Sequence, residues 1–224
     1  MQVTLIQQTP DPIEHIARYA AICYDSDPKN PQKLVDRLYE NGHHSVFEHI
    51  TFTFRIDGVS RALSHQLVRH RMASYTQRSQ RYCAEDEQDS NVIPPSIATD
   101  EDALPVYRKA LKACQDAYDE LVNLHNIPRE DARYILPNAR TTSLYMTLNL
   151  RELMHLCNER MCSRAQWEIR ALATEMAAQV DQALRKYLVP KCESGWRVCK
   201  MPCGKRKVQK NTNNANESIS ETSK

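Results

Sequence analysis

Two short segments alternate strictly between apolar and polar residues, and they constrain the fold more than any other feature. Residues 50–56 (ITFTFRI) and 142–148 (TSLYMTL) each place their apolar side chains two residues apart. This period predicts β-strands with one buried face. Longer segments with helical periodicity surround both strands. We therefore predict an α+β fold, a single domain with a modest central β-sheet flanked by long helices.

The helices are predicted from apolar residues that recur every three or four positions. Gly42 is a plausible stop for the first helix, and Asn149 is a good N-cap after the second strand. Pro128 suits the first turn of a short helix that carries Arg133. The predicted helices are residues 31–42, a helix opened by Gly58, residues 105–126 with an apolar stripe from Val106 to Leu124, the short helix, a helix from Asn149 to Met161, and residues 165–187.

Composition excludes several classes of protein. The 224 residues are 41% hydrophobic, which suffices for one core, and we place this domain at residues 1–190. Residues 191–224 form a basic, cysteine-bearing segment and a tail, and we expect the end of the tail to be disordered. No apolar run is long enough for a membrane span and the start lacks signal-peptide features, so we expect a cytoplasmic protein with reduced cysteines. The four glycines form no dinucleotide-binding or phosphate-binding loop. Residues 86–102 are predicted to be an acidic surface excursion.

The densest polar cluster follows the helix opened by Gly58. On that helix Gln66, Arg69 and His70 are spaced to face a common site. The guanidinium groups suit phosphate oxygens, and the hydroxyl and amide groups can recognise the edge of a pyrimidine. A solvated basic turn is the other interpretation. The polar run, predicted to be a loop, contains Arg69, His70, Arg71, Ser74, Tyr75, Gln77, Ser79, Arg81 and Tyr82.

Two further sets could carry chemistry. Asn149, Arg151, His155 and Arg160 lie on one predicted helix, beside its apolar stripe; an ordinary solvent-facing surface is the alternative. The segment from His43 to His49 (HHSVFEH) contains three histidines and a glutamate, but it lacks the helical spacing of a metalloprotease site. We therefore predict no metal there.

The run RHRMASYTQRS, residues 69–79, resembles the signature of flavin-dependent thymidylate synthases, which reads RHR, seven residues, then Ser. GHHSVFEHITFTF (42–54), ARYILP (132–137), the NLR helix start (149–151) and SRAQWEIR (163–170) are similar to segments of that family, in the same order. The resemblance covers about residues 1–190. It implies reductive methylation of dUMP to dTMP, with methylenetetrahydrofolate as carbon donor and NAD(P)H as reductant through FAD. It also implies a homotetramer whose active sites lie at subunit junctions.

The resemblance also implies roles for individual residues. Arg160 matches the arginine that activates the substrate, and His43 matches a histidine near flavin and folate. Positions that hold FAD are matched by Ser45, Arg69, His70, Arg71, Gln77, Asn149, Arg151 and His155. Positions around dUMP are matched by Gln66, Arg69, Gln77, Arg78, Ser79, Gln80, Arg81, Arg133 and Arg160. Thr76 and His155 depart from the commoner residues of the pattern, and both retain hydrogen-bonding ability.

The implied mechanism needs no protein nucleophile. The family's route has flavin relay both electrons and carbon, while Arg160, always charged, stabilises negative charge on the uracil ring. Ser79 as a nucleophile is an alternative, as is Cys162, although a buried thiol is the simpler interpretation of the latter. A nucleic-acid-binding module that uses the RHR segment and the basic tail at residues 205–207 is a second hypothesis. A zinc-binding appendage formed by Cys192, Cys199 and Cys203 is a third.

Overall fold

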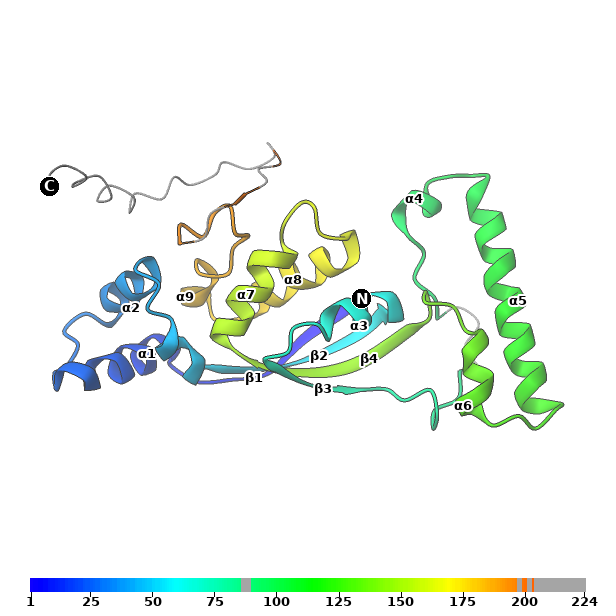
Figure 1. Cartoon of the computed structure of the whole chain (residues 1–224), viewed down its shortest axis with the longest axis horizontal. Coiled ribbons are helices and arrows are strands. Elements are labelled where there is room, and N and C mark those ends of the chain that lie inside the picture. The colour runs from blue at the N-terminus through cyan, green and yellow to red at the C-terminus, as the bar shows by residue number, and fades with distance from the viewer. Residues whose placement is uncertain (86–89, 197–198, 201–202, 204–224) are drawn as a thin grey trace, which may run out of the picture. The chain divides into compact units, whose positions relative to one another are not determined.

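The computed structural model describes residues 1–85, 90–196, 199–200 and 203 (Figure 1). They form a mixed α/β fold with a single four-stranded sheet in the order β1-β2-β4-β3, so the predicted fold class and modest sheet are confirmed. The chain divides into two compact units. Unit 1 contains residues 1–6 and 53–147, and unit 2 contains residues 7–52 and 148–224. The domain boundary at residue 190 and the homotetramer remain predictions.

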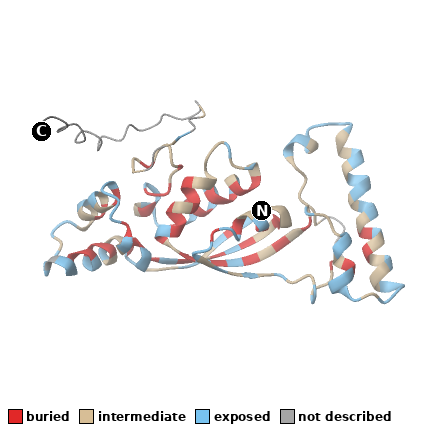
Figure 2. Ribbon diagram, in the orientation of Figure 1, coloured by how far each residue is buried: buried red, intermediate tan, exposed pale blue. Residues whose placement is uncertain are grey.

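The sheet is built from β1 (Gln2–Gln8), β2 (Thr51–Ser60), β3 (Ala73–Gln77) and β4 (Thr141–Asn149). Both predicted strands are confirmed as β2 and β4. Along each of them, buried apolar residues alternate with more exposed ones, which Figure 2 shows as interrupted red bands. On the opposite face, the hydroxyls of Thr53 and Thr147 lie 3.0 Å apart across the two strands. Alternation therefore predicted which side of each strand meets the core.

Strand β3 was predicted to be a loop, and that prediction is wrong. Its sequence, ASYTQ, is polar because β3 ends the strand order and has one neighbour in the sheet. Such a strand buries little side-chain surface, so apolar alternation does not mark it. Strand β3 lies between the RHR turn and residues 78–82, so it fixes the backbone next to both groups of predicted site residues.

Helix α3 (Arg61–Leu67) begins three residues later than predicted. Gly58 lies inside β2 with φ +69°, a left-handed conformation that favours glycine. Ser60 is the actual N-cap, because its Oγ accepts the Leu63 amide at 2.9 Å. Gly58 thus marks an irregular strand position rather than a helix start.

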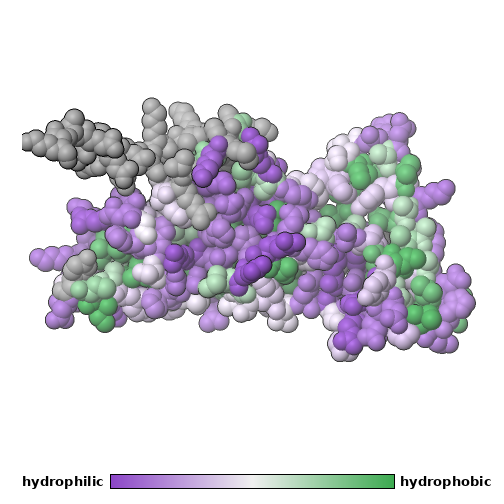
Figure 3. All heavy atoms as spheres, in the orientation of Figure 1, coloured by the Kyte–Doolittle hydropathy of each residue, from purple (hydrophilic) through white to green (hydrophobic). Residues whose placement is uncertain are grey.

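The remaining helices of unit 1 are α4 (Pro95–Ala98), α5 (Ala103–Asn123) and α6 (Arg129–Ala132), followed by the 3-10 turn η3 (Arg133–Ile135). The long amphipathic helix is confirmed as α5, but its apolar stripe is largely exposed: Val106 is 69% exposed and Leu124, just past the helix, 73%. Gln115 and Tyr118 are the residues it buries. Figure 2 shows few buried positions along α5, and Figure 3 shows hydrophobic side chains gathered over it. Pro128 is the N-cap of α6, not part of its first turn.

Unit 2 contains α1 (Pro12–Ala21), η1 (Ile22–Tyr24), α2 (Pro31–Glu40), η2 (Ser45–His49), α7 (Leu150–Arg160), α8 (Trp167–Gln179) and α9 (Gln182–Arg185). The predicted stop at Gly42 is confirmed by its φ of +74° just beyond α2. The predicted cap at Asn149 is confirmed by its side chain, which accepts the Glu152 amide at 2.9 Å. Helices α7 and α8 pack against each other. No counterparts of β1 and α1 were predicted.

The predicted helix over residues 165–187 is in fact two helices. Helix α8 ends at Gln179, Val180 takes an extended conformation, and Asp181 caps α9 through the Ala183 amide at 2.8 Å. Val180 and Leu184 are both buried, so the apolar period continues across the break and conceals it. Asp181 was the local signal, since aspartate favours N-caps over helix interiors.

A polar cluster ties α2 to the end of α9. The Asp36 carboxylate accepts a hydrogen bond from the Tyr187 hydroxyl at 2.5 Å and lies 2.5 Å from Lys186 Nζ. Gln32 donates to the same carboxylate at 3.2 Å. Burial raises the pKa of Asp36, but the hydrogen bonds from Lys186 and Tyr187 outweigh it and leave the pKa below its ordinary value.

Some predictions fall on residues outside the described ranges. These are the start of the acidic excursion, residues 86–89, the basic residues 205–207 and the tail over residues 211–224. Within the described part of the chain, no helix is both long and apolar enough to cross a bilayer.

Candidate functional site

In unit 1 the RHR segment forms the turn between α3 and β3. Arg69 and Arg71 are exposed, whereas His70 is buried. The Tyr75 hydroxyl, on β3, lies 2.8 Å from the carbonyl oxygens of both Leu67 and His70. These hydrogen bonds from β3 fix the conformation of the turn that carries the two exposed guanidinium groups.

Gln77 connects three elements next to that turn. Its amide nitrogen lies 3.1 Å from Ser64 Oγ on α3 and 3.2 Å from Thr142 Oγ1 on β4. Gln66, in the last turn of α3, is half-buried. These contacts fix the orientation of the Gln77 amide, which is what recognition of a ligand by hydrogen bonds requires.

Two arginines that were predicted to bind the substrate, Arg81 and Arg133, both contact Glu130. They are 52 positions apart in the chain. Arg81 binds the Glu130 carboxylate through Nε at 2.8 Å and Nη2 at 2.7 Å, and Arg133 Nε donates to the Glu130 carbonyl at 3.0 Å. Hydrogen bonding to Glu130 raises the pKa of Arg81. Burial lowers the pKa of Arg61, and the charges of Arg133 and Arg78 lower it further. The charge of Glu85 opposes this lowering, so arginines and carboxylates are interleaved in this part of unit 1.

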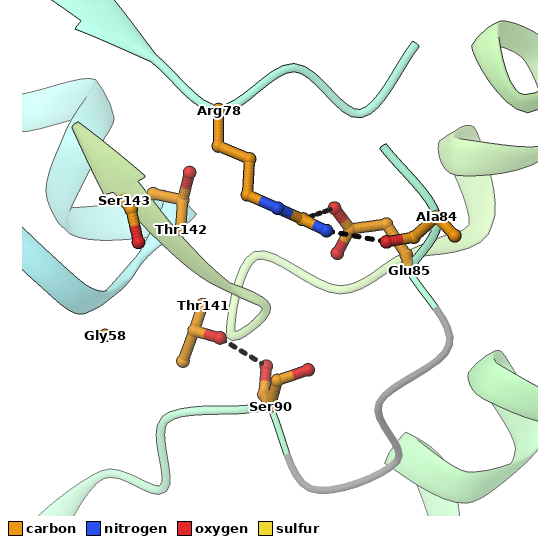
Figure 4. A pocket seen from close by; sticks show the side chains of 8 residues that line it. All are labelled: Gly58, Arg78, Ala84, Glu85, Ser90, Thr141, Thr142 and Ser143. Atoms are coloured by element: carbon orange, nitrogen blue, oxygen red, sulfur yellow. Dashed lines mark hydrogen bonds and ion pairs between the residues drawn. The ribbon is translucent and has the colours of Figure 1, made fainter. Parts of the chain in front are cut away.

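Arg78 lines a polar pocket of about 230 Å³ (Figure 4). Its guanidinium group is bound to the Glu85 carboxylate and donates to the Ala84 carbonyl at 2.6 Å. The pocket also contains Ser90 and Thr141, whose hydroxyl donates to the Ser90 carbonyl. It is smaller than the clefts of about 300–1,000 Å³ that hold larger ligands. This pocket alone does not accommodate a flavin dinucleotide.

Arg140 is the centre of a buried polar network that includes Glu85 and Ser90 of the pocket. The Arg140 and Glu85 side chains are 1% and 2% exposed, with Arg140 Nε 3.3 Å from Glu85 Oε2. Arg140 also donates to the Ser90 hydroxyl at 2.7 Å and to Gln115 on α5. Gln115 in turn donates to the Glu85 carbonyl at 2.7 Å. The network fixes the chain on both sides of residues 86–89 against α5 and β4.

Ser79 and Gln80 follow β3 and are both half-buried. The Ser79 hydroxyl accepts the Arg81 amide at 3.2 Å, and its carbonyl accepts the Cys83 amide at 3.0 Å. These bonds shape the turn that presents Arg81. They give Ser79 a local structural role, and its role as a nucleophile remains an untested alternative.

In unit 2, His43 is exposed on the loop between α2 and η2, and Ser45 is exposed at the first residue of η2. His44, between them, is buried, with Nε2 2.9 Å from the Tyr39 carbonyl. This alternation leaves the outer two side chains accessible and anchors the loop through the middle one. Glu48, in the same 3-10 helix, forms an ion pair with Arg151 at the start of α7.

Helix α7 carries the other predicted residues of unit 2. Asn149 and Arg151 lie at its start, His155 in its middle and Arg160 at its end. At about 1.5 Å per residue, Arg151 and Arg160 are separated by roughly 14 Å along the axis. Burial raises the pKa of the Cys157 thiol to about 12, so this cysteine is a protonated core residue.

The predicted site residues are therefore divided between the units. Those in unit 2 are Ser45, Asn149, Arg151, His155 and Arg160, with His43. Those in unit 1 are Gln66, Arg69, His70, Arg71, Gln77, Arg78, Ser79, Gln80, Arg81 and Arg133. Unit 1 brings Arg81 and Arg133 together, whereas Arg78 is bound within its own pocket.

Sequence reasoning missed residues that shape these sites. Arg61 donates to the Arg78 carbonyl at 2.9 Å, and Glu130 joins Arg81 to Arg133. Glu130 is adjacent to the family-like segment 132–137, which was the available signal. No sequence signal indicated Glu85 or Arg140, because neither belongs to a motif and the two paired residues are 55 positions apart.

Residues 4–184 match the family described as thymidylate synthase complementing protein. A flavin-dependent thymidylate synthase from Geobacter sulfurreducens is 46% identical over 187 residues, covering 79% of this chain and 80% of that protein. One from Clostridium tetani is 39% identical, covering 92% and 94%. The fold is similar to a crystal structure of thymidylate synthase X from Helicobacter pylori with FAD and dUMP, with a TM-score of 0.67 and 24% identity over 84% of this chain and 97% of that one. It is also similar to a crystal structure of a UMP/dUMP methylase from Streptomyces cacaoi, with a TM-score of 0.70 and 22% identity over 83% of this chain and 93% of that one. This chain belongs to the family of flavin-dependent thymidylate synthases.

Proposed function

We propose that this chain methylates dUMP to dTMP, with FAD as cofactor, methylenetetrahydrofolate as carbon donor and NAD(P)H as reductant. The observation that supports the proposal beyond family membership is that Arg81 binds the Glu130 carboxylate while Arg133 donates to the carbonyl of the same residue. Arg81 holds a carboxylate with two N–H groups, a geometry that equally suits a phosphate. The nucleotide phosphate would therefore bind at this point.

Each unit, taken by itself, exposes donors that suit the anionic groups of a flavin dinucleotide. In unit 1 these are Arg69 and Arg71 on the turn held by Tyr75, and in unit 2 they are Ser45 and Arg151. Guanidinium groups complement phosphate oxygens in charge and in hydrogen-bond geometry. Bound FAD would supply the two-electron chemistry of the reduction.

The chain's own residues bind and polarise the substrate. Gln77 and Ser79 would orient the pyrimidine, while Arg81 and Arg133 hold its phosphate. Arg160, at the end of α7, would stabilise negative charge on the uracil ring and so raise electron density at C5. Positioning and preorganised charge are thus the protein's contribution.

Further parts of the proposal concern assembly and location. Homotetramer formation would place donors from several chains around each active site, which suits the small size of the pocket in unit 1. The exposed apolar stripe of α5 is a surface that such an assembly would cover. A cytoplasmic location completes the proposal.

The test uses the purified full-length chain. We expect a yellow protein that forms dTMP from dUMP, methylenetetrahydrofolate and NADPH. Arg160→Ala should lower kcat by about 10²–10³, the effect of removing one preorganised charge, while flavin absorbance is retained. Arg164→Ala is the matched control, since Arg164 is an exposed arginine in the following loop and should leave kcat unchanged. Full activity of Arg160→Ala would remove Arg160 from its role, and absence of flavin and of dTMP in the wild type would refute the function.

A further inference from the structure

The chain beyond α9 contacts elements that carry predicted active-site residues, and it follows the end of the family-model match. That match ends at residue 184. We call residues 189–196 the terminal segment. The sequence offered one hypothesis for it, a zinc site that would combine its one cysteine, Cys192, with Cys199 and Cys203.

The terminal segment begins by binding the end of α7. Asn158, fully buried, donates from its side chain to the Val189 carbonyl at 2.7 Å, and its own carbonyl accepts the Lys191 amide at 3.2 Å. Lys191 Nζ lies 3.3 Å from the Glu159 carboxylate. These contacts involve the two residues directly before Arg160. Ser194, 3% exposed, then continues the segment inward, with its hydroxyl donating to the Lys191 carbonyl at 3.1 Å.

The segment ends with an aromatic contact to the loop that carries His43 and Ser45. The Trp196 indole meets the His44 ring edge-on, with centroids 4.6 Å apart and an interplanar angle of 83°. His44 is also stacked with Tyr39 at 5.5 Å and meets Phe47 edge-on at 5.4 Å. Trp196 therefore completes an aromatic cluster around His44, whose side chain helps to anchor the loop.

We propose that Trp196 is a positioning residue for flavin binding, which holds the His43–Ser45 loop in place through His44. The inference rests on the proposed function, because it assigns this loop to the flavin site. Trp196 acts through His44 and is itself not expected to contact the cofactor. Without the indole, His44 loses one ring of its aromatic cluster, and the loop can leave the conformation that exposes Ser45 and His43 together.

The contribution of Trp196 can be measured as a change in flavin affinity. We expect Trp196→Ala to raise the FAD Kd about tenfold, the upper end of what one aromatic pair contributes. Trp196→Phe keeps a ring against His44 and should raise the FAD Kd by a smaller factor, about threefold. The matched control is a chain that ends at Cys203, which retains the whole terminal segment and should bind FAD as the wild type does.

Hydrogen exchange of the ligand-free protein gives a readout independent of flavin. The amides of His43, His44 and Phe47 donate to backbone carbonyls at 2.9, 2.9 and 3.2 Å, so their exchange reports the loop directly. In both Trp196 variants we expect faster exchange there, whereas the amides of β2 in unit 1 should exchange as in the wild type.

The outcomes separate the inference from the proposed function. Faster loop exchange together with weaker FAD binding supports a positioning role; an unchanged FAD Kd, or unchanged loop exchange, overturns it. If Trp196→Ala does not fold, Trp196→Phe decides by the same two measurements. If the wild type binds no FAD, the proposed function fails and the flavin role of Trp196 fails with it, while loop exchange still shows whether Trp196 holds the loop.

Discussion

Replacing Arg140 by methionine tests how strongly the buried polar network stabilises unit 1. The substitution removes the partner of a carboxylate that is itself 2% exposed and leaves the Ser90 hydroxyl and Gln115 without their donor. Breaking a buried ion pair from one side costs about 3–5 kcal/mol, because the remaining charge stays desolvated. Glu85 keeps its bond to Arg78, so we expect the lower end, about 3 kcal/mol.

The assay is urea unfolding of the ligand-free full-length chain, followed by fluorescence at one protein concentration. With a slope of about 3 kcal/mol per molar urea, the midpoint should fall by about 1 M at unchanged slope. Lys112→Met is the control, since Lys112 pairs with Asp116 at 70% and 54% exposure and such pairs contribute about 0–1 kcal/mol. If Arg140→Met and Lys112→Met shifted the midpoint equally, the argument from burial would be refuted.

Three further predictions follow from single contacts. Glu130→Gln should lower the KM for dUMP by about threefold, because an exposed carboxylate no longer competes with phosphate for Arg81; a raised KM in steady-state kinetics would contradict this. Because the pKa of Asp36 is lowered by its hydrogen bonds against the effect of burial, its stabilising effect is present at neutral pH and lost as pH falls through that pKa. The urea midpoints of wild type and Asp36→Asn should therefore differ at about pH 7 and converge below about pH 4, and a gap that widened in acid would be the wrong sign. Asn149→Ala should cost about 1 kcal/mol in the same assay, since it leaves the Glu152 amide uncapped, whereas Asn149→Asp should restore most of the loss.

The candidate site was predicted in part from the sequence. Motifs that resemble the family in register nominated the candidate arginines, and their roles stay predictions. They did not distinguish Arg81, which lies with Arg133 around Glu130, from Arg78, which is bound to Glu85. That difference depends on a carboxylate that no motif contains. Likewise, no pattern indicated that Trp196 contacts His44, 152 positions earlier.

The sequence alone determined the features that depend on neighbouring residues. The alternation in β2 and β4, the stop at Gly42 and the cap at Asn149 each arise from a few adjacent side chains and the backbone they adjoin. Only the tertiary structure decided that polar residues 73–77 form a strand, that the apolar stripe of α5 is exposed, and that buried residues continue through the break at Val180. Each of these depends on what packs against the segment from elsewhere in the chain, and burial by distant residues leaves no local periodic signal.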